Sequence, residues 1–180
     1  MSNTRLAAIL AASAALALSG AAAATETHCE GHEANLKVVQ NMTDELFIPR
    51  DITKASKYYP PEVLSHNADG GGGTATKVPI ADMQKMWTNS KATYPDRNMV
   101  NDIIVCNGDM VVVRVTMTGT MKGPIGPMAP TGKKFTTTAT DIYRIKDGKV
   151  VERWGNNDTI TQLKQLGLLG AVAAAEEAKK

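Results

Sequence analysis

The sequence lacks a marked excess of charge of either sign. Its 20 Lys and Arg residues nearly balance 18 Asp and Glu residues, which leaves a formal net charge of +2. The basic residues are scattered, and no basic run is long enough to follow a phosphate backbone. Proteins that hold nucleic acid or an acidic membrane surface by charge need such a patch. We therefore expect no nucleic-acid partner.

The sequence also lacks a hydrophobic run long enough for a membrane span. The apolar stretch Leu6–Leu18 follows Arg5, is mostly alanine, and is shorter than the roughly 20 residues that a spanning helix needs. The small residues Ala22–Ala24 then fit a signal-peptide cleavage site. We predict a signal peptide over residues 1–24, an exported mature protein (periplasmic or secreted) and no stable membrane insertion.

Cysteine is scarce, since the chain contains only Cys29 and Cys106. In an exported chain an even pair predicts a disulfide bond. The bond would close a loop of about 77 residues and contribute about 3–4 kcal/mol by restricting the unfolded chain. The alternatives are two free thiols or, for Cys106, a place in the apolar core.

The sequence shows no complete metal or cofactor motif. His28, Cys29 and His32 are potential metal ligands, but a fourth ligand is not evident nearby. The run Gly70–Gly73 lacks the flanking strand and helix of a dinucleotide site, so a hinge is the better interpretation. The loop Gly126–Lys133 lacks the spacing of a phosphate-binding loop. We therefore expect no metal and no cofactor.

The first half of the mature chain has helical periodicity. Apolar residues recur at helical spacing over Glu33–Phe47, and Pro49 ends that helix. Asp51 can cap a shorter helix that runs to Tyr58. Residues 62–67 form a short extended or helical piece, and a second amphipathic helix is predicted from Pro79 to Ala92.

The second half has the composition of strands. Segments rich in Val, Ile and Thr predict strands over Met99–Val105, Met110–Met121, Lys134–Ile145 and Lys149–Trp154. Asp147-Gly148 predicts a hairpin, because both turn positions require positive φ. A last helix is expected over Thr159–Leu166, with Asp158 or Thr159 as its N-cap and Gly167 at its end. Helices followed by an antiparallel meander predict a single α+β domain.

The end of the last strand carries the clearest indication of function. If the strand continues past Trp154, alternation places one set of residues on a common face. That set is Val150, Glu152, Trp154, Asn156 and Asp158. A carboxylate just beyond a Trp, at the mouth of a curved sheet, is well placed to act as an acid or base.

Several short segments, in order and spacing, match a known family. They are His66-Asn67, Trp87, Tyr94–Asp96, Asp109–Arg114, Gly119-Thr120, Pro130–Lys133, Ile142–Arg144, Asp147–Glu152, Trp154, Asp158 and Gln165–Gly167. On these residues the chain resembles the SnoaL-like polyketide or ester cyclases of the nuclear-transport-factor-2-like (NTF2-like) superfamily. It departs from their pattern at Arg153, where His is frequent, and at Gly155-Asn156, where Asp and an apolar residue are frequent.

The resemblance implies an α+β NTF2-like cone, in which a bent antiparallel sheet and about three helices enclose a largely apolar cavity. It implies a SnoaL-like domain over residues 36–168, between an N-terminal extension (25–35) and a C-terminal tail (169–180). In the characterised cyclases an Asp near the end of the last strand acts as acid/base in an aldol ring closure, without metal or cofactor. Asp158 matches that Asp, and His66 matches a His at the cavity rim.

The candidate catalytic residues are therefore Asp158 and His66. The candidate substrate-binding residues are Trp87, Trp154, Tyr143, Asn156 and Asp141. An Asp buried in an apolar cone has a raised pKa, which suits proton abstraction next to a carbonyl. As alternatives, Asp158 caps the last helix, the two Trp side chains belong to the core, and Asp141 pairs with Arg114 or Lys134.

Together these patterns predict an exported SnoaL-like protein that binds a small apolar or aromatic molecule. The predicted activity is a cofactor-free cyclase or isomerase reaction with an Asp as acid/base. One alternative is a non-catalytic binding protein on the same cone, which export favours, since polyketide cyclisation usually takes place inside the cell. Another is an interaction protein that forms a homodimer.

Overall fold

The computed structural model describes residues 24–66 and 75–170 of the chain. The predicted signal peptide, apart from residue 24, lies outside the described residues, as do the run Gly70–Gly73 and the predicted tail from residue 171 onward. Within the described ranges no helix has both the length and the apolar character needed to cross a membrane.

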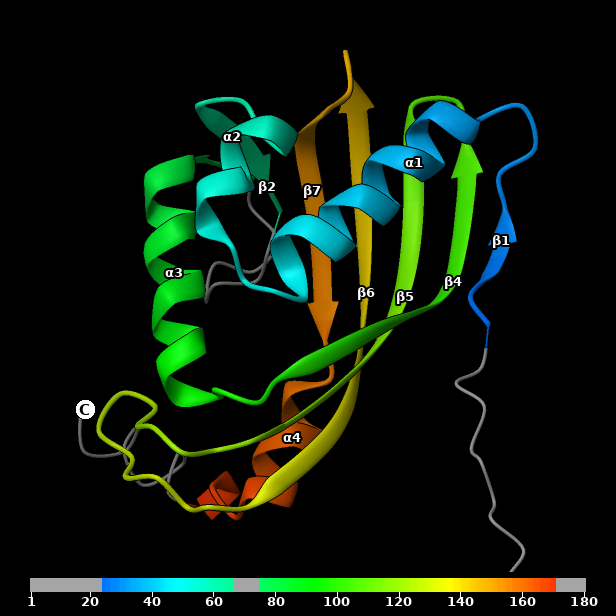
Figure 1. Ribbon diagram of the computed structural model, residues 1–180. Coiled ribbons are helices and arrows are strands. Elements are labelled where there is room, and N and C mark those ends of the chain that lie inside the picture. The colour runs from blue at the N-terminus through cyan, green and yellow to red at the C-terminus, as the bar shows by residue number, and fades with distance from the viewer. Residues whose placement is uncertain (1–23, 67–74, 171–180) are drawn as a thin grey trace, which may run out of the picture.

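One bent, open sheet of seven strands forms the body of the fold (Figure 1). In chain order its strands are β1 (Glu26–His28), β2 (Glu62–Ser65), β3 (Thr76–Pro79), β4 (Asn98–Asn107), β5 (Met110–Thr120), β6 (Lys134–Lys146) and β7 (Lys149–Asn157). The long strands β4 to β7 form the expected antiparallel meander. At the two ends of the meander, β1 pairs in parallel with β4 and β2 pairs in parallel with β7, so the whole sheet is mixed.

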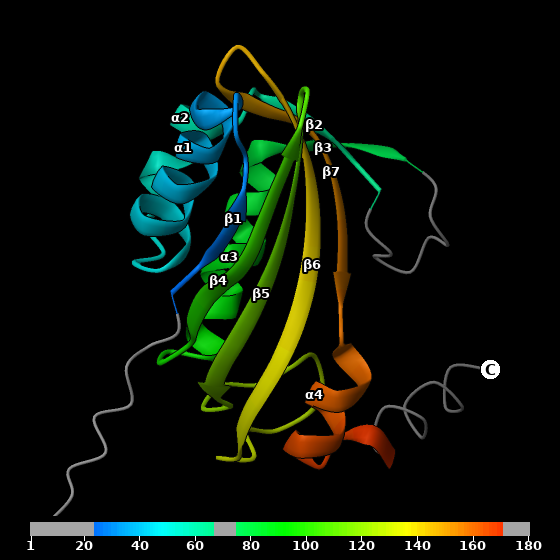
Figure 2. The same ribbon diagram turned by 90° about the vertical axis from the view of Figure 1, so that its right-hand side faces the viewer.

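Three helices cover one face of this sheet (Figure 2), namely α1 (Glu33–Met42), α2 (Ala55–Tyr58) and α3 (Ile80–Thr93), with a 3₁₀ turn at Ile52–Lys54. A fourth helix of the described residues, α4 (Thr159–Leu166), comes after β7. Viewed along the sheet, α1, α2 and α3 lie on the same side, and α4 follows the end of β7 (Figure 2). The prediction of an α+β fold with a bent sheet and helices on it is confirmed, with four helices in place of about three.

The first predicted helix changes its winding before it ends. After α1 the chain continues as a π-helical turn over Thr43–Phe47, in which the Ile48 amide donates to the Thr43 carbonyl over 2.9 Å. The Asn101 side chain of β4 donates to the Thr43 hydroxyl over 3.0 Å and fixes this turn to the sheet. Such π turns insert one residue into a helix and re-aim the side chains that follow. Phe47 is the last residue of this turn.

Two turns form as the sequence predicts. Asp147 and Gly148 have φ values of 50° and 72°, so the β6–β7 hairpin uses two left-handed turn residues. Gly167, at φ 74°, ends α4, and the amide of Leu168 then donates to the carbonyl of Leu163. The turn before β7 and the end of α4 are therefore both formed by residues that adopt left-handed backbone angles.

A β-bulge changes which residues of β7 share a face. Ile145 lies opposite Val150, whereas Arg144 lies opposite Glu152, so Val151 is an extra residue. Val150 is consequently buried in the core, while Glu152 reaches the opposite face and bonds with Arg144. The expectation that Val150 shares a face with Glu152 and Trp154 is wrong, because strict alternation fails at an extra residue.

The N-terminal extension is fixed to the sheet by a covalent bond. Cys29 and Cys106 form a disulfide across 77 residues, with Cα atoms 4.6 Å apart. Cys29 follows β1 and Cys106 lies in β4, so the bond reinforces the pairing of those two strands. Both residues are buried in the main core cluster, which α1 and the sheet share.

We predict that reduction of this disulfide lowers the free energy of unfolding by about 3–4 kcal/mol, because the unfolded chain regains the freedom of a long loop. Urea unfolding with and without dithiothreitol measures the change. The variant with both Cys29→Ser and Cys106→Ser is the control, since its stability is expected to match the reduced protein and to ignore the reductant. A stability difference below about 1 kcal/mol would contradict the prediction.

Candidate ligand pocket

A cavity of about 270 Å³ lies between the helices and the sheet. Its apolar lining is Phe47, Tyr59, Met83, Met86, Trp87, Tyr94, Met99, Val115, Met117, Phe135, Ala139 and Tyr143. Its polar lining is Ser90, Arg97, Asp141, Arg153, Asn157, Thr159 and Gln162. A mostly apolar concave site with a few polar groups is typical of a small-molecule pocket, and this volume is at the small end of the usual range.

Aromatic side chains form two walls of the pocket. The Trp87 ring of α3 packs against the rings of Phe47 and Tyr59, with ring centroids 5.8 Å apart in each case. Tyr94 and Phe135 form a second pair with centroids 5.1 Å apart. These pairs are tilted or edge-to-face, which are favourable arrangements for aromatic rings. Trp87, predicted to bind substrate, therefore does line the cavity.

An ion pair lies among these apolar residues. Arg153 of β7 donates from Nε and Nη2 to Oδ1 of Asp141 on β6, over 3.2 and 2.9 Å. Gly155 lies opposite Asp141 and carries no side chain, so the Arg153 side chain reaches the carboxylate diagonally across the two strands. Only 12% of the Asp141 side chain and 16% of the Arg153 side chain are exposed. Removing one partner of such a buried pair typically costs about 3–5 kcal/mol.

Two tyrosines accompany the ion pair. Burial raises the pKa of Tyr59, and so does the nearby charge of Asp141, against an opposing effect of Arg153. Burial and the charge of Asp141 likewise raise the pKa of Tyr143 well above its ordinary value. Both phenols therefore stay protonated and can donate hydrogen bonds. The Tyr59 hydroxyl is fully buried and has no hydrogen-bond partner among the described residues.

The expected pairing of Asp141 with Arg114 or Lys134 is wrong. Asp141 lies opposite Val113, one residue before Arg114, so alternation places the Arg114 side chain on the other face of the sheet. There Arg114 donates to the hydroxyls of Thr138 and Thr140. Lys134 lies at the start of β6, seven residues from Asp141 in an extended strand. The partner of Asp141 is Arg153.

Asp158 lies at the N-terminus of α4 and not among the residues that line the cavity. Its carboxylate is exposed and accepts from the Thr161 amide over 3.1 Å, which makes it the N-cap of the helix. These hydrogen bonds from Thr161 lower the pKa of Asp158, so the expectation that burial raises that pKa is wrong. Its neighbours Asn157 and Thr159 do line the cavity, so Asp158 stands close to the pocket wall.

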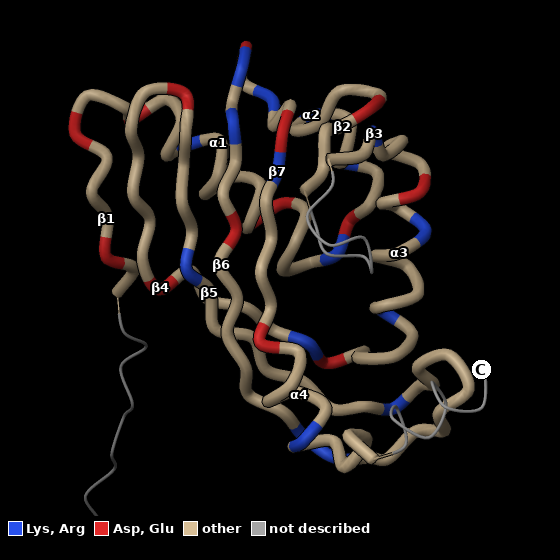
Figure 3. The backbone as a smooth tube through the Cα atoms, turned by 180° about the vertical axis from the view of Figure 1, so that it is seen from behind, with Lys and Arg blue, Asp and Glu red and all other residues tan. Residues whose placement is uncertain are grey.

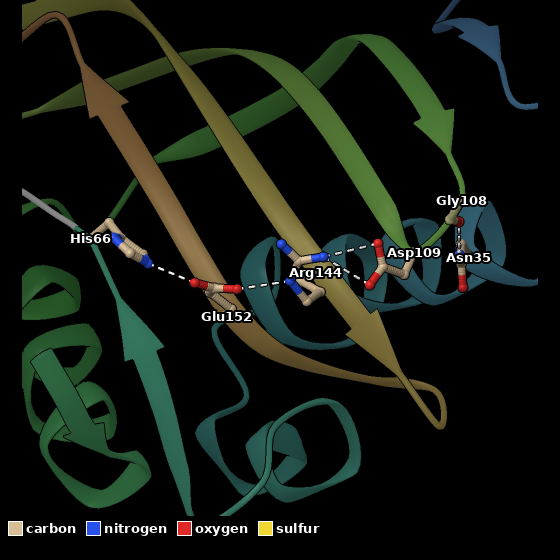
Figure 4. A network of polar contacts seen from close by, with 6 residues as sticks. All are labelled: Asn35, His66, Gly108, Asp109, Arg144 and Glu152. Atoms are coloured by element: carbon tan, nitrogen blue, oxygen red, sulfur yellow. Dashed lines mark hydrogen bonds and ion pairs between the residues drawn. The ribbon is translucent and has the colours of Figure 1, made fainter. Parts of the chain in front are cut away.

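His66, Trp154 and Asn156 lie on or toward the face of the sheet away from the pocket lining. The His66 ring stacks on Trp154 with centroids 4.6 Å apart, and its Nε2 lies 2.7 Å from the Glu152 carboxylate. Glu152 also accepts from Arg144, which bonds in turn with Asp109, and Figure 4 shows this chain of contacts running across the strands. The hydrogen bonds from Arg144 and His66 lower the pKa of Glu152.

This outer face also carries an apolar row. Val105, Val112, Ile142 and Trp154 lie opposite one another on β4, β5, β6 and β7. All four are partly exposed. Basic and acidic residues are both spread over the strands and helices, as Figure 3 shows from behind. Pairing of two copies of the chain through this face stays a prediction.

The potential metal ligands near the N-terminus have other partners. Cys29 is in the disulfide, His28 bonds with Glu26, and His32 Nε2 accepts from the Gly108 amide over 3.3 Å. In the described part of the chain no group of three or more His, Cys, Asp or Glu side chains is placed to hold a metal ion.

The structure thus brings together three of the predicted site residues, namely Trp87, Asp141 and Tyr143. Sequence reasoning missed Tyr59, Arg97 and Arg153 as parts of the same pocket. Asp141 and Tyr143 are two residues apart on a strand, which places them on one face. Arg153 lies opposite Tyr143, but strict alternation counted forward from the hairpin along β7 assigns it to the wrong face because of the bulge at Val151.

A bent sheet with helices on its concave side and a small apolar pocket between them defines an NTF2-like cone. The family model of the SnoaL-like polyketide cyclases matches residues 37–166. Because this match covers well over half of the sequence, the chain belongs to the SnoaL-like polyketide cyclase family. No curated protein matches the chain.

Solved structures of similar proteins carry more than one assigned activity. IdmH, a candidate polyketide cyclase from Streptomyces antibioticus, is 26% identical, with a TM-score of 0.65 over 74% of this chain and 98% of IdmH. AclR, a candidate hydroxylase from Streptomyces galilaeus, is also 26% identical, with a TM-score of 0.61 over 78% of this chain and 97% of AclR. A candidate SnoaL-like cyclase from Jannaschia sp. CCS1 is 20% identical, with a TM-score of 0.66 over 74% and 92% of the two chains, and shows the fold alone.

For Asp158 we predict a structural effect that separates capping from charge. Asp158→Ala is expected to lower the melting temperature by about 2–4 °C at pH 7, whereas Asp158→Asn keeps a capping side chain and most of the stability. Because the folded-state pKa of Asp158 is lowered, the stabilisation is complete above the unfolded pKa of about 3.9 and is lost as the pH falls through the folded value. Melting curves from pH 7 to pH 2 measure this. A constant difference between wild type and Asp158→Ala down to pH 2 would contradict it.

Proposed function

We propose that the protein binds a small apolar or aromatic molecule in the pocket and acts on it as a cofactor-free cyclase or isomerase. The observation that carries the proposal is the ion pair of Asp141 and Arg153 among apolar side chains, beside the unpartnered hydroxyl of Tyr59. A buried hydroxyl without a partner costs about 1–3 kcal/mol. A ligand with a hydrogen-bond acceptor, such as a ketone oxygen, removes that cost when it binds.

The proposed chemistry is proton transfer next to a carbonyl. Asp141 is the one carboxylate among the described residues that line the pocket, and it serves as the acid/base. Arg153 binds Oδ1 and holds the carboxylate in one orientation. The unpartnered hydroxyl of Tyr59 donates to the ligand oxygen on which negative charge develops, while the Tyr143 hydroxyl interacts with Asp141. Enolate formation at such a site is the step that a cyclase and an isomerase have in common.

Asp158, the acid/base expected from the sequence, is the second candidate for this role. It follows the pocket residue Asn157 directly, and a long ligand that protrudes from the cavity would pass near it. Its exposed position and lowered pKa favour the capping role, so we assign proton transfer to Asp141. A non-catalytic binding protein would use the same pocket without either carboxylate as a base.

We also propose that the protein is exported. The predicted signal peptide supports this, as does the disulfide bond, because structural disulfides persist in oxidising compartments. Export separates the protein from intermediates made inside the cell. It therefore favours a substrate or ligand that is taken from outside or released there.

2-Naphthamide is a neutral aromatic probe with a carbonyl oxygen, and we expect it to bind to the purified protein in calorimetric titrations. The variant Tyr59→Phe is expected to bind it about 3–10-fold more weakly, because a hydrogen bond of about 1 kcal/mol is lost. The same variant is expected to melt at a higher temperature without ligand, because the unpartnered hydroxyl is gone.

Tyr58→Phe is the matched control, since Tyr58 is a buried neighbour that does not line the pocket. Its affinity for 2-naphthamide is expected to equal that of the wild type. Equal losses in the two variants would contradict a specific contact with Tyr59. The absence of any binding to the wild-type protein would contradict the pocket assignment itself.

For catalysis, 2-tetralone reports proton abstraction without requiring the natural substrate. We predict that the wild-type protein accelerates exchange of its α-protons for deuterium in D₂O, followed by proton NMR. Asp141→Asn is expected to lower the catalysed rate by about 100-fold or more, the usual effect of losing a general base. Asp158→Asn is expected to keep the wild-type rate.

The double variant Asp141→Asn/Arg153→Gln guards against a loss of folding, because it removes both charges of the buried pair. It should melt near the wild-type temperature and remain inactive. Exchange that survives in Asp141→Asn but disappears in Asp158→Asn would transfer the role to Asp158. Binding of 2-tetralone without accelerated exchange in the wild type would support the non-catalytic alternative.

A further inference from the structure

The pocket lining contains one more positive charge than it can neutralise. Three of its side chains are charged, namely Arg97, Asp141 and Arg153. Asp141 and Arg153 neutralise one another through their ion pair. Among residues 24–66 and 75–170, Arg97 has no carboxylate within ion-pair distance, and its guanidinium bonds only with the Ser90 hydroxyl, over 3.3 Å. Ser90 is itself a pocket residue.

The acidic residue nearest to Arg97 in the sequence is committed elsewhere. The two carboxylate oxygens of Asp96 accept from the amide and the hydroxyl of Thr120, over 2.8 and 2.6 Å. These bonds connect Asp96 to β5 and do not involve Arg97. The remaining polar residues of the lining near the end of β7 and in α4, namely Asn157, Thr159 and Gln162, are neutral.

A second arginine increases the positive potential around Arg97. Arg50 is buried and donates to the backbone carbonyls of Tyr94, Pro95 and Arg97, at 2.7 to 3.3 Å. Carbonyl groups are dipoles, so they stabilise this guanidinium without cancelling its charge, which the nearby carboxylate of Asp96 offsets only in part. Burial lowers the pKa of Arg97, and the charge of Arg50 lowers it further. An arginine nevertheless remains protonated in proteins, so the cost of its unpaired charge stays.

Arg97 lies far along the pocket from the Asp141 pair. It follows α3 and precedes β4. The connection from α3 to β4 lies at the end of the molecule where α4 also lies (Figure 1). Its Cα packs next to Gly119 of β5, which lies opposite Phe135 of β6. On β6, Asp141 lies six residues beyond Phe135, and six residues of an extended strand span roughly 20 Å. Apolar side chains such as Met99, Val115 and Met117 line the pocket as well.

The geometry points to a ligand with a carboxylate group, which Arg97 binds while the apolar body of the ligand extends toward Tyr59 and Asp141. This inference rests on the proposed function, since it concerns the ligand of the same pocket. A guanidinium presents two parallel N–H donors that match a carboxylate, and pairing with it removes the cost of the partly buried, unpaired charge of Arg97. Arg97 is thus a specificity-determining residue that selects an apolar or aromatic carboxylic acid over its neutral analogues.

The test compares two probes of nearly the same shape, 2-naphthoate and the neutral 2-naphthamide, by calorimetric titration at pH 7. The wild-type protein is expected to bind 2-naphthoate at least about 10-fold more tightly, the value of a charge-assisted hydrogen bond. In Arg97→Gln this preference is expected to disappear, while the affinity for 2-naphthamide stays within about 2-fold of the wild type. Arg97→Lys, which keeps the charge but not the paired donors, is expected to retain part of the preference.

Arg114→Gln serves as the matched control, because Arg114 is exposed on the other face of the sheet and should leave both affinities unchanged. Melting temperatures check that each variant is folded. Substitution of the Arg97 side chain keeps its backbone carbonyl, which accepts from Arg50. Equal binding of the two probes to the wild type would overturn the assignment to Arg97, and so would a preference that persists in Arg97→Gln. Either result leaves the proposed function standing. Failure of both probes to bind overturns the two proposals together.

Discussion

The buried contact between Asp141 and Arg153 is the interaction on which the character of the pocket depends. A carboxylate or a guanidinium alone in this apolar space would be very unfavourable, and each is tolerated because the other is present. The two groups sit diagonally on neighbouring strands, so the bent sheet holds them in place without help from a loop. Two protonated tyrosines complete this polar group, and apolar side chains separate it from Arg97, the other charged residue of the lining.

Much of the fold follows from local sequence signals. The Asp147-Gly148 turn, Asp158 as a cap and Gly167 as a helix end each depend on the conformational preference of one or two residues, and all three form as expected. The strands of the meander are also predictable from their content of Val, Ile and Thr. The parallel pairing of β1 with β4 and of β2 with β7 could not be predicted, because it depends on contacts between distant parts of the chain.

The site was less predictable than the fold, and one residue explains much of the difference. Val151 is an extra residue in β7, and nothing in the local sequence announces a bulge there. Counting alternate residues across it therefore assigns Trp154 to the pocket, whereas the structure places Trp154 against His66 and directs Arg153 inward. The resemblance to a family cannot correct such an error, since relatives with this fold include both candidate cyclases and a candidate hydroxylase.

The bond between Cys29 and Cys106 has a consequence for the behaviour of the protein at high concentration. β4 is an outer strand of the meander, and without β1 its backbone donors and acceptors would form an open edge that a strand of another molecule can extend. β1 has only three residues, all of them exposed, so its own hydrogen bonds hold it weakly. The disulfide keeps this short strand in place. It thereby acts as a guard against edge-to-edge aggregation in the oxidising surroundings where such a bond persists.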